Sequence, residues 1–249
     1  MPRTMNPRAR ALRRDAFIRS GTRLIQTKGY EQMSVQDVLD DLGASRGAFY
    51  HYFPSKQALL EAVVDHVVIS ALGTVAPITA ELGMSAISKL RGIFTGIAGW
   101  KEDRRPLMLA LLRVWHSDDN VLTRDKLRGR LMASLVPMLA EIIVQGVGEG
   151  SMSAGSPDGA ARALVSLLLG AQDAAVDLFL AGQDDEVPYR AVSEVAAGYT
   201  EAMERVLGLP PGSLNLFSEE RVRPWFDAGR DKAPKAFEEV AEHGFRDPY

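Results

Sequence analysis

Cysteine is absent from this 249-residue chain, and histidine occurs only four times. Without cysteine the protein has neither a disulfide framework nor a thiolate metal site. The histidines are scattered, and none shows the spacing of a helical metal-binding pair. We therefore expect no metal and no other cofactor. The histidine positions are His51, His66, His116 and His243.

Long apolar runs are also missing. No stretch approaches about eighteen uninterrupted apolar residues, which is the length that a membrane-spanning helix needs. The basic N-terminus, MPRTMNPRAR, is not followed by an apolar segment, so it does not have the form of a secretory signal. These absences predict a cytoplasmic protein without a membrane partner.

Strand patterns and catalytic motifs are lacking as well. Apolar residues recur at helical spacing, and no segment alternates convincingly with period two. We therefore expect an all-α fold. The chain has no Ser-His-Asp order, no glycine-rich phosphate loop and no paired catalytic carboxylates. An all-helical enzyme remains an alternative, but no residue constellation supports it.

The charges are unevenly distributed. Residues 1–60 contain ten Lys/Arg and five Asp/Glu, which gives this segment a net charge of +5. The rest of the chain carries a net charge of −8, so the total is −3. A positive segment on an acidic protein suits an N-terminal contact with phosphate, while the remainder stays soluble.

Residues 34–56, SVQDVLDDLGASRGAFYHYFPSK, have the pattern of two short helices joined by a tight turn. Ser34 is a candidate N-cap, and Asp37 stands where an acidic side chain completes a capping box. Gly43 follows the first helix at a position that favours a left-handed residue. Ser45 can cap the second helix. This order of elements is the helix-turn-helix pattern.

The second helix of such a motif enters the major groove of DNA. Arg46 can bind a guanine edge or a phosphate with two N–H groups. Gly47 and Ala48 allow close approach, and the phenol, imidazole and ammonium groups that follow can donate to phosphate oxygens. The candidate DNA-binding residues are Ser34, Gln36, Ser45, Arg46, Gly47, Ala48, Tyr50, His51, Tyr52 and Lys56.

A first helix is expected over residues 10–28, with its inner stripe formed by Phe17, Gly21, Leu24 and Ile25. In the second helix of the motif, two phenylalanines four residues apart face the core. These are Phe49 and Phe53.

The segment GASRGAFYHYFPSK, from Gly43 to Lys56, resembles the DNA-binding signature of the TetR family of transcriptional regulators in residue order and spacing. The resemblance extends back to about residue 12, and beyond about residue 70 it is one of layout only. Gly21 and Ala48 depart from it, because the family more often has Ala and Thr there. The first departure is expected to loosen a helix, and the second removes a hydroxyl.

The resemblance implies a three-helix DNA-binding domain followed by a larger helical ligand-binding and dimerisation domain. The implied function is that of a repressor, less often an activator, released from a palindromic operator by a small-molecule effector. A dimeric ligand-binding module with a vestigial motif is the alternative, although the intact caps and Arg46 argue against decay. The expected divisions are a flexible basic arm over residues 1–9, the helix-turn-helix domain over 10–56, the helical domain over 57–208 and a C-terminal extension over 209–249.

Further helices are expected beyond the motif. One begins near Ser55 and ends near residue 72, before a break or kink over residues 73–83. The other expected helical segments are 84–100, 104–117, 121–148, 157–181 and 188–207. Pro137 is expected to kink the segment 121–148. The resemblance implies that the last two pair with their copies in a homodimer.

Effector-binding candidates come from two places. Methionine and aromatic residues around 100–116 can line an adaptable apolar pocket, or they can belong to the core. Within the apolar helix 157–181, two carboxylates share one face, where they either form salt bridges or bind a donor or cation of a ligand. The candidates are Trp100, Met108, Leu112, Trp115, His116, Met138, Gln172, Asp173 and Asp177.

The C-terminal extension has two apolar clusters among charged residues, 214–217 and 225–226. A tail held on the protein's own surface by Trp225 and Phe226 is the preferred interpretation. An arm that embraces the second subunit is the alternative, and a short helix is expected over 234–243.

Overall fold

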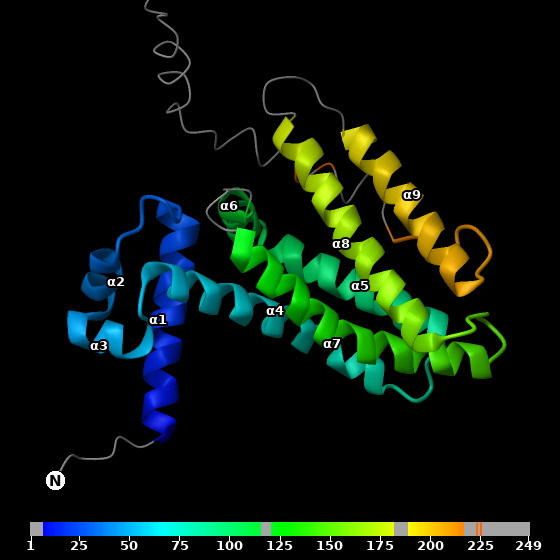
Figure 1. Ribbon diagram of the computed structural model, residues 1–249, viewed down its shortest axis with the longest axis horizontal. Coiled ribbons are helices and arrows are strands. Elements are labelled where there is room, and N and C mark those ends of the chain that lie inside the picture. The colour runs from blue at the N-terminus through cyan, green and yellow to red at the C-terminus, as the bar shows by residue number, and fades with distance from the viewer. Residues whose placement is uncertain (1–6, 116–120, 182–188, 217–222, 224, 226–249) are drawn as a thin grey trace, which may run out of the picture.

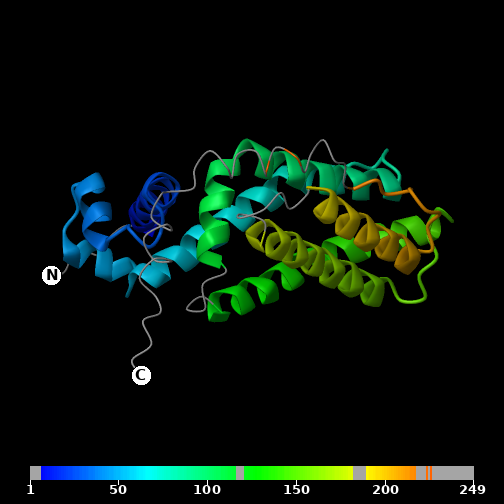
Figure 2. The same cartoon turned by 90° about the horizontal axis from the view of Figure 1, so that it is seen from above.

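The computed structural model describes residues 7–115, 121–181, 189–216, 223 and 225. Within these residues the chain forms nine α-helices and no strand, as the sequence predicts. A small N-terminal head leads through one long helix into a larger helical body (Figure 1). The head lies at one end of the elongated molecule, as a second view shows (Figure 2).

The head is formed by α1 (Pro7–Lys28), α2 (Val35–Leu42) and α3 (Arg46–Tyr52). α1 begins three residues earlier than expected, so the end of the predicted flexible arm is helical. Pro7 suits this first helical position because its missing N–H has no partner there. Residues 1–6 of the arm lie outside the described residues.

Aromatic rings form the centre of the head. Phe17 of α1, Phe49 of α3 and Phe53 are at most 2% exposed, which confirms the predicted inward faces. The ring of Phe17 meets those of Phe49 and Phe53 edge-on, with centroid distances of 5.7 Å and 6.1 Å. Gly21 allows close packing, because a Cβ there would lie 3.1 Å from the buried Leu59. The glycine that was expected to loosen α1 therefore provides the space in which α4 packs.

α4 (Lys56–Ala80) connects the head to the body. The break expected over residues 73–83 occurs only at the end of this range, because the helix continues through Gly73 and Pro77 to Ala80 and the next helix begins at Ala86. Pro77 is tolerated three residues before the end of α4, where its missing N–H removes only one helical hydrogen bond. One continuous helix therefore carries residues of both cores.

Five helices form the body, and α7 continues across Pro137. Their bounds agree with the predicted segments to within a few residues. They are α5 (Ala86–Asp103), α6 (Arg105–Trp115), α7 (Val121–Gly148), α8 (Pro157–Ala181) and α9 (Tyr189–Leu207). Ser156 caps α8, since its hydroxyl accepts from the N–H of Gly159 at 3.1 Å.

The start of the C-terminal extension belongs to the body core. Leu214 and Leu216 are 1% and 6% exposed. The buried carboxylate of Glu204 accepts from the N–H groups of Gly212 and Leu214 at 2.9 Å and 2.7 Å. Further on, Arg105 lies over the ring of Trp225, with 5.8 Å from Cζ to the centroid. The predicted contacts of Phe226 and the helix over 234–243 lie outside the described residues.

Two helices have the length and mean hydropathy of a membrane span, namely Lys56–Ala80 and Thr123–Gly148. Both contribute buried side chains to the helical cores, such as Leu59 of α4 and Ile143 of α7. Core helices of soluble proteins have the same composition, so this observation is weak support for a membrane location.

Candidate nucleic-acid interface

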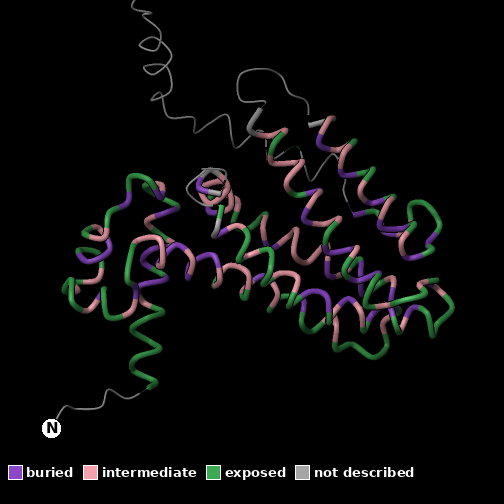
Figure 3. Tube along the Cα trace, in the orientation of Figure 1, coloured by how far each residue is buried: buried purple, intermediate pink, exposed green. Residues whose placement is uncertain are grey.

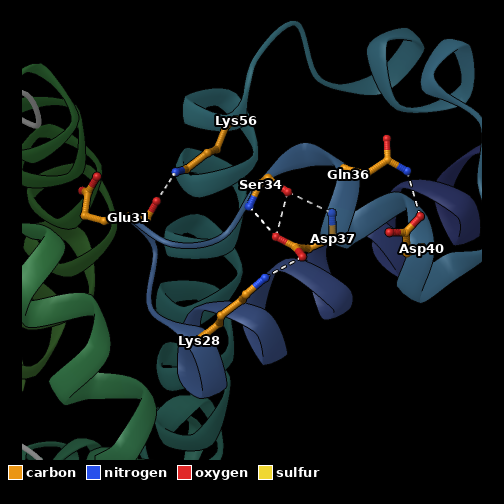
Figure 4. Close-up of polar contacts among 7 residues, drawn as sticks. All are labelled: Lys28, Glu31, Ser34, Gln36, Asp37, Asp40 and Lys56. Carbon is orange, nitrogen blue, oxygen red and sulfur yellow. Dashed lines mark hydrogen bonds and ion pairs between the residues drawn. The ribbon is translucent and has the colours of Figure 1, made fainter. Parts of the chain in front are cut away.

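α2 starts at the predicted capping box (Figure 4). The Ser34 hydroxyl accepts from the N–H of Asp37 at 3.1 Å, and the Asp37 carboxylate accepts from the N–H of Ser34 at 2.7 Å. Lys28 at the end of α1 donates to the same carboxylate at 2.6 Å. The hydrogen bonds from Lys28 and then Ser34 hold the pKa of Asp37 well below its usual range. α1 and α2 are thus joined where the motif begins.

A second polar contact joins α1 to the end of α2. The buried Ser20 donates to Asp41 at 2.6 Å, and Arg23 forms an ion pair with the same carboxylate. These two groups, the Ser20 hydroxyl first, lower the pKa of Asp41. Gly43 then ends the helix with a φ of 56°, as predicted.

α3 is held from its inner side. The Ser45 hydroxyl accepts from the N–H of Ala48 at 3.3 Å, which confirms the predicted N-cap. Phe49 is buried, whereas Tyr50, one residue further, is 53% exposed. Arg46 and His51 are also exposed, and Arg46 makes no ion pair or hydrogen bond within the described part of the chain. α3 therefore presents a cation, a phenol and an imidazole on a rigid aromatic base.

The other candidates have structural contacts of their own. Ala48 and Tyr52 are partly buried against the head core, and Gly47 is exposed. Gln36 donates to Asp40 at 2.7 Å. Ser34 and Ser45 are the caps already described, so their hydroxyls position the helices that carry the other groups.

Lys56 bends toward the turn between α1 and α2. Its ammonium lies 4.2 Å from the ring centroid of Tyr30 and donates to the carbonyl oxygen of Glu31 at 3.3 Å. Burial, and then the charge of Glu31, raise the pKa of Tyr30 to about 12. Lys56 stabilises the start of α4 from this position (Figure 4).

A series of polar contacts ties α4 to the first turns of α7. Gln57 accepts from the Tyr30 hydroxyl at 2.8 Å and donates to the buried Thr123 hydroxyl at 2.7 Å. One turn further along α4, Glu61 accepts from Lys126 at 3.0 Å. The next pair along the two helices is formed by Asp65 and Arg130. None of these links was predicted from the sequence, because polar partners far apart in the chain leave no periodic signal.

Apolar contacts join the same elements. Val114 of α6 is 7% exposed and belongs to the aromatic core of the head, and Leu127 of α7 packs against that core. The head therefore does not end at α4. Its core is completed by two helices of the body, as expected for three helices that bury little apolar area alone.

The effector candidates lie in the body, in different surroundings. Trp100 is buried beneath Arg104, whose Cζ lies 4.6 Å from the ring centroid. Met108 and Leu112 are partly buried on α6, and Met138 packs partly buried against the body core. The side chain of Trp115 and all of His116 lie outside the described residues.

The predicted polar face of α8 is engaged by cations. Asp173 pairs with Arg128 of α7 at 2.6 Å, which is the salt-bridge alternative considered from the sequence. Gln172 accepts from Lys101 of α5 at 3.0 Å. Burial lowers the pKa of Lys101, although part of this residue stays accessible. Asp177 is exposed. Within the described residues no group of three His, Asp or Glu side chains could hold a metal ion.

Known proteins resemble this chain most clearly in the head. Residues 17–63 match the family described as bacterial regulatory proteins, tetR family. The transcriptional regulator EthR of Mycolicibacterium smegmatis is 42% identical over 53 residues, which span 21% of this chain and 24% of that protein. The matched stretch is thus about a quarter of that relative. The transcriptional regulator AcuR of Cereibacter sphaeroides is 28% identical over 151 residues, 50% of this chain and 68% of that protein.

Solved structures share the fold over most of the chain. A TetR transcription regulator from Haloarcula marismortui has a TM-score of 0.58 at 20% identity, and the match covers 79% of this chain and 99% of that chain. A transcriptional regulator from Cytophaga hutchinsonii has a TM-score of 0.55 at 17% identity, covering 78% and 96%. The head, with its capped helix-turn-helix, is therefore similar to the bacterial regulatory proteins of the tetR family, and the helical body shares the fold of the solved regulator structures.

Proposed function

We propose that the protein is a sequence-specific DNA-binding transcriptional regulator, and in the simplest case a cytoplasmic repressor. The observation that carries the proposal is the position of Arg46, Tyr50 and His51 on the exposed face of α3. A short helix in a helix-turn-helix reads base edges from its N-terminal residues and phosphates from its other side chains. Arg46 is the first residue of α3 and so lies at the end of the helix that contacts base edges in the major groove.

The active form is proposed to be a homodimer built from α8 and α9. Val176, Leu178 and Phe179 of α8 are partly exposed in the single chain, although the residue types favour burial. The two helices already approach closely, because a Cβ at Gly170 would lie 3.1 Å from the Tyr199 hydroxyl. A symmetric pair would hold two heads at a fixed separation, which is the geometry that a palindromic operator requires.

A small-molecule effector is proposed to release the operator by binding in the body. Such a ligand changes the position of the heads only through its different affinity for the two arrangements. The polar contacts of Gln57, Glu61 and Asp65 with α7 support this coupling, because they tie α4 to a helix that spans the body. A shift of α7 would therefore be transmitted to the start of α4.

An acidic effector fits the body better than the cationic one considered from the sequence. The Asp173 carboxylate already has the Arg128 guanidinium as its partner. Among the described residues, the Lys101 ammonium has only the neutral amide oxygen of Gln172 as its partner. An effector carboxylate near Lys101 would supply the missing negative charge, while Trp100 and Met108 lie close by in sequence to contact an apolar part.

The test is binding to DNA selected by the protein itself from a random-sequence pool. Arg46→Ala and Tyr50→Ala should each keep the dimer, measured by light scattering, and lose affinity for the selected sequence in a gel shift. Arg162→Ala is the matched control, because Arg162 is an exposed arginine of α8 that pairs with Asp158. Unchanged binding by both head variants would contradict the assignment of α3, and the absence of any selected sequence would contradict the function.

A further inference from the structure

The N-terminal part of α1 extends beyond the packed head. Every residue from 7 to 15 is exposed, whereas Phe17 and Ile18 are buried. The exposed turns project from the head toward the N-terminus (Figure 3). The first acidic residue of the chain is Asp15, and α1 has no acidic residue in its first turn. This projecting segment is therefore strongly positive and has little contact with the rest of the described chain.

Three arginines of this segment share a face of α1. Arg10, Arg13 and Arg14 precede Phe17 by seven, four and three residues, and residues at these spacings lie on one side of a helix. Phe17 is the side chain through which α1 packs on Phe49 of α3. The side of α1 that packs on α3 therefore continues beyond the head, and there it carries the three arginines.

Two of these guanidinium groups are held in place by the aromatic core. Arg13 lies over the ring of Phe17 and Arg14 over the ring of Phe53, with 5.7 Å and 5.4 Å from Cζ to the centroids. A guanidinium stacked on a ring keeps its N–H donors available for a planar or tetrahedral anion. Neither arginine, nor Arg10, forms an ion pair within the described residues.

Local electrostatics disfavours this arrangement in the isolated chain. Cations near a helix N-terminus are opposed by the helix dipole, and Arg10 repels both Arg13 and Arg14 at helical spacing. A polyanion on this face would offset both effects. We propose that Arg10, Arg13 and Arg14 form a second DNA contact that binds backbone phosphates flanking the groove entered by α3. The inference rests on the proposed DNA-binding function and adds a sequence-independent contact to it.

The experiment compares the full-length protein with Arg10→Gln/Arg13→Gln/Arg14→Gln, because glutamine keeps good helix propensity. Affinity is measured on the selected operator and on a random-sequence duplex between about 50 and 200 mM KCl. The slope of log affinity against log salt should fall by about five on both DNAs, since the two heads of the proposed dimer together lose six phosphate contacts and each releases about 0.9 counterion fewer. The ratio of the two affinities should not change.

Two further variants isolate the cause. Arg91→Gln/Arg104→Gln/Arg128→Gln removes the same charge from exposed positions of the body outside α8 and α9, and should leave the slope as in the wild type. Arg10→Lys/Arg13→Lys/Arg14→Lys keeps the charge and should retain most of the slope. The proposal is overturned if the glutamine variant, folded by circular dichroism, has the wild-type slope, or if the body variant changes it equally. Wild-type protein that binds neither DNA would instead contradict the proposed function.

Discussion

The side-chain amide of Gln57 donates to the hydroxyl of Thr123 at 2.7 Å, and this bond ties the first turn of α4 to the first turn of α7. The same amide accepts from Tyr30 at 2.8 Å in the turn that precedes α2. A single side chain therefore links the helix-turn-helix, the connecting helix and the body. Because Thr123 is 5% exposed, the bond is shielded from competing water.

Thr123→Val is expected to lower the free energy of unfolding by about 1–3 kcal/mol, because it keeps the shape of the side chain and removes the acceptor of the hydrogen bond from Gln57. It should also weaken the effector response more than operator binding. Urea unfolding and gel shifts with and without effector measure the two effects. Thr95→Val is the control, since Thr95 bonds, within the described part of the chain, only to carbonyls of its own helix. Equal losses of stability and effector response in the two variants would show that the hydrogen bond between Gln57 and Thr123 does not couple the head to the body.

Ser45→Ala is expected to cost about 1 kcal/mol of stability, the usual value of a helix N-cap. The loss falls on a seven-residue helix, so operator affinity should drop as α3 frays even though the hydroxyl need not contact DNA. Chemical unfolding and a gel shift measure both quantities. Ser166→Ala, an exposed substitution within α8, should leave stability unchanged or slightly raised. A stability loss without any loss of affinity would separate the cap from DNA binding.

Local signals allowed the head to be predicted from the sequence. The capping box at Ser34, the left-handed Gly43 and the cap at Ser45 each depend on residues at most a few positions apart. The inward phenylalanines of α3 follow from helical spacing alone. The exposed residues of the recognition helix could therefore be predicted from the sequence, because they are the positions of that helix that neither cap it nor face the core.

The predictions that failed depend on tertiary contacts or on tolerance within a helix. Pro77 indicated a break, yet a proline in the last turn removes a single hydrogen bond and α4 continues. Gly21 indicated a weak helix. Its packing against Leu59 could not be predicted, because the two residues are 38 positions apart in the chain. The link between Gln57 and Thr123, which are 66 positions apart in the chain, has no sequence pattern at all.

Gly21→Ala is expected to destabilise the protein, although alanine is the better helix former. The added Cβ would lie 3.1 Å from Leu59, which is 1% exposed and would have to shift within the core. Overpacking of this kind costs about 1–3 kcal/mol, more than the gain of about 1 kcal/mol in helix propensity. Gly73→Ala in α4 is the matched control, because nothing lies within 4 Å of its added Cβ, and it should stabilise. Thermal unfolding compares the two, and stabilisation by both would show that Leu59 yields.

Asp37→Asn should flatten the acid limb of the stability profile. The bonds from Lys28 and Ser34 depress the pKa of Asp37 in the folded state, so its contribution is fully present above the ordinary aspartate pKa of about 4. That contribution is lost as the pH falls further, toward the folded pKa. Urea unfolding at several pH values between about 2 and 7 should therefore show a smaller drop in the variant than in the wild type. Asp158→Asn, in an exposed pair on α8, should leave the slope unchanged. An identical acid limb in the Asp37 variant would mean that the capping box is not formed in solution.

Lys101→Met should raise stability at neutral pH and abolish the response to an acidic effector. Burial lowers the pKa of Lys101, so below its folded pKa the protein carries the full cost of an ammonium that has no anionic partner among the described residues. That cost disappears as the pH rises to the unfolded value of about 10.4, so the gain from the substitution should be large at pH 7 and vanish near that value. Urea unfolding at the two pH values measures it. Lys126→Met is the control for the loss of a lysine, because its ammonium is exposed and pairs with Glu61 at the surface. A constant gain across this pH range would show that folding does not lower the pKa of Lys101, and an unchanged effector response would place the effector elsewhere in the body.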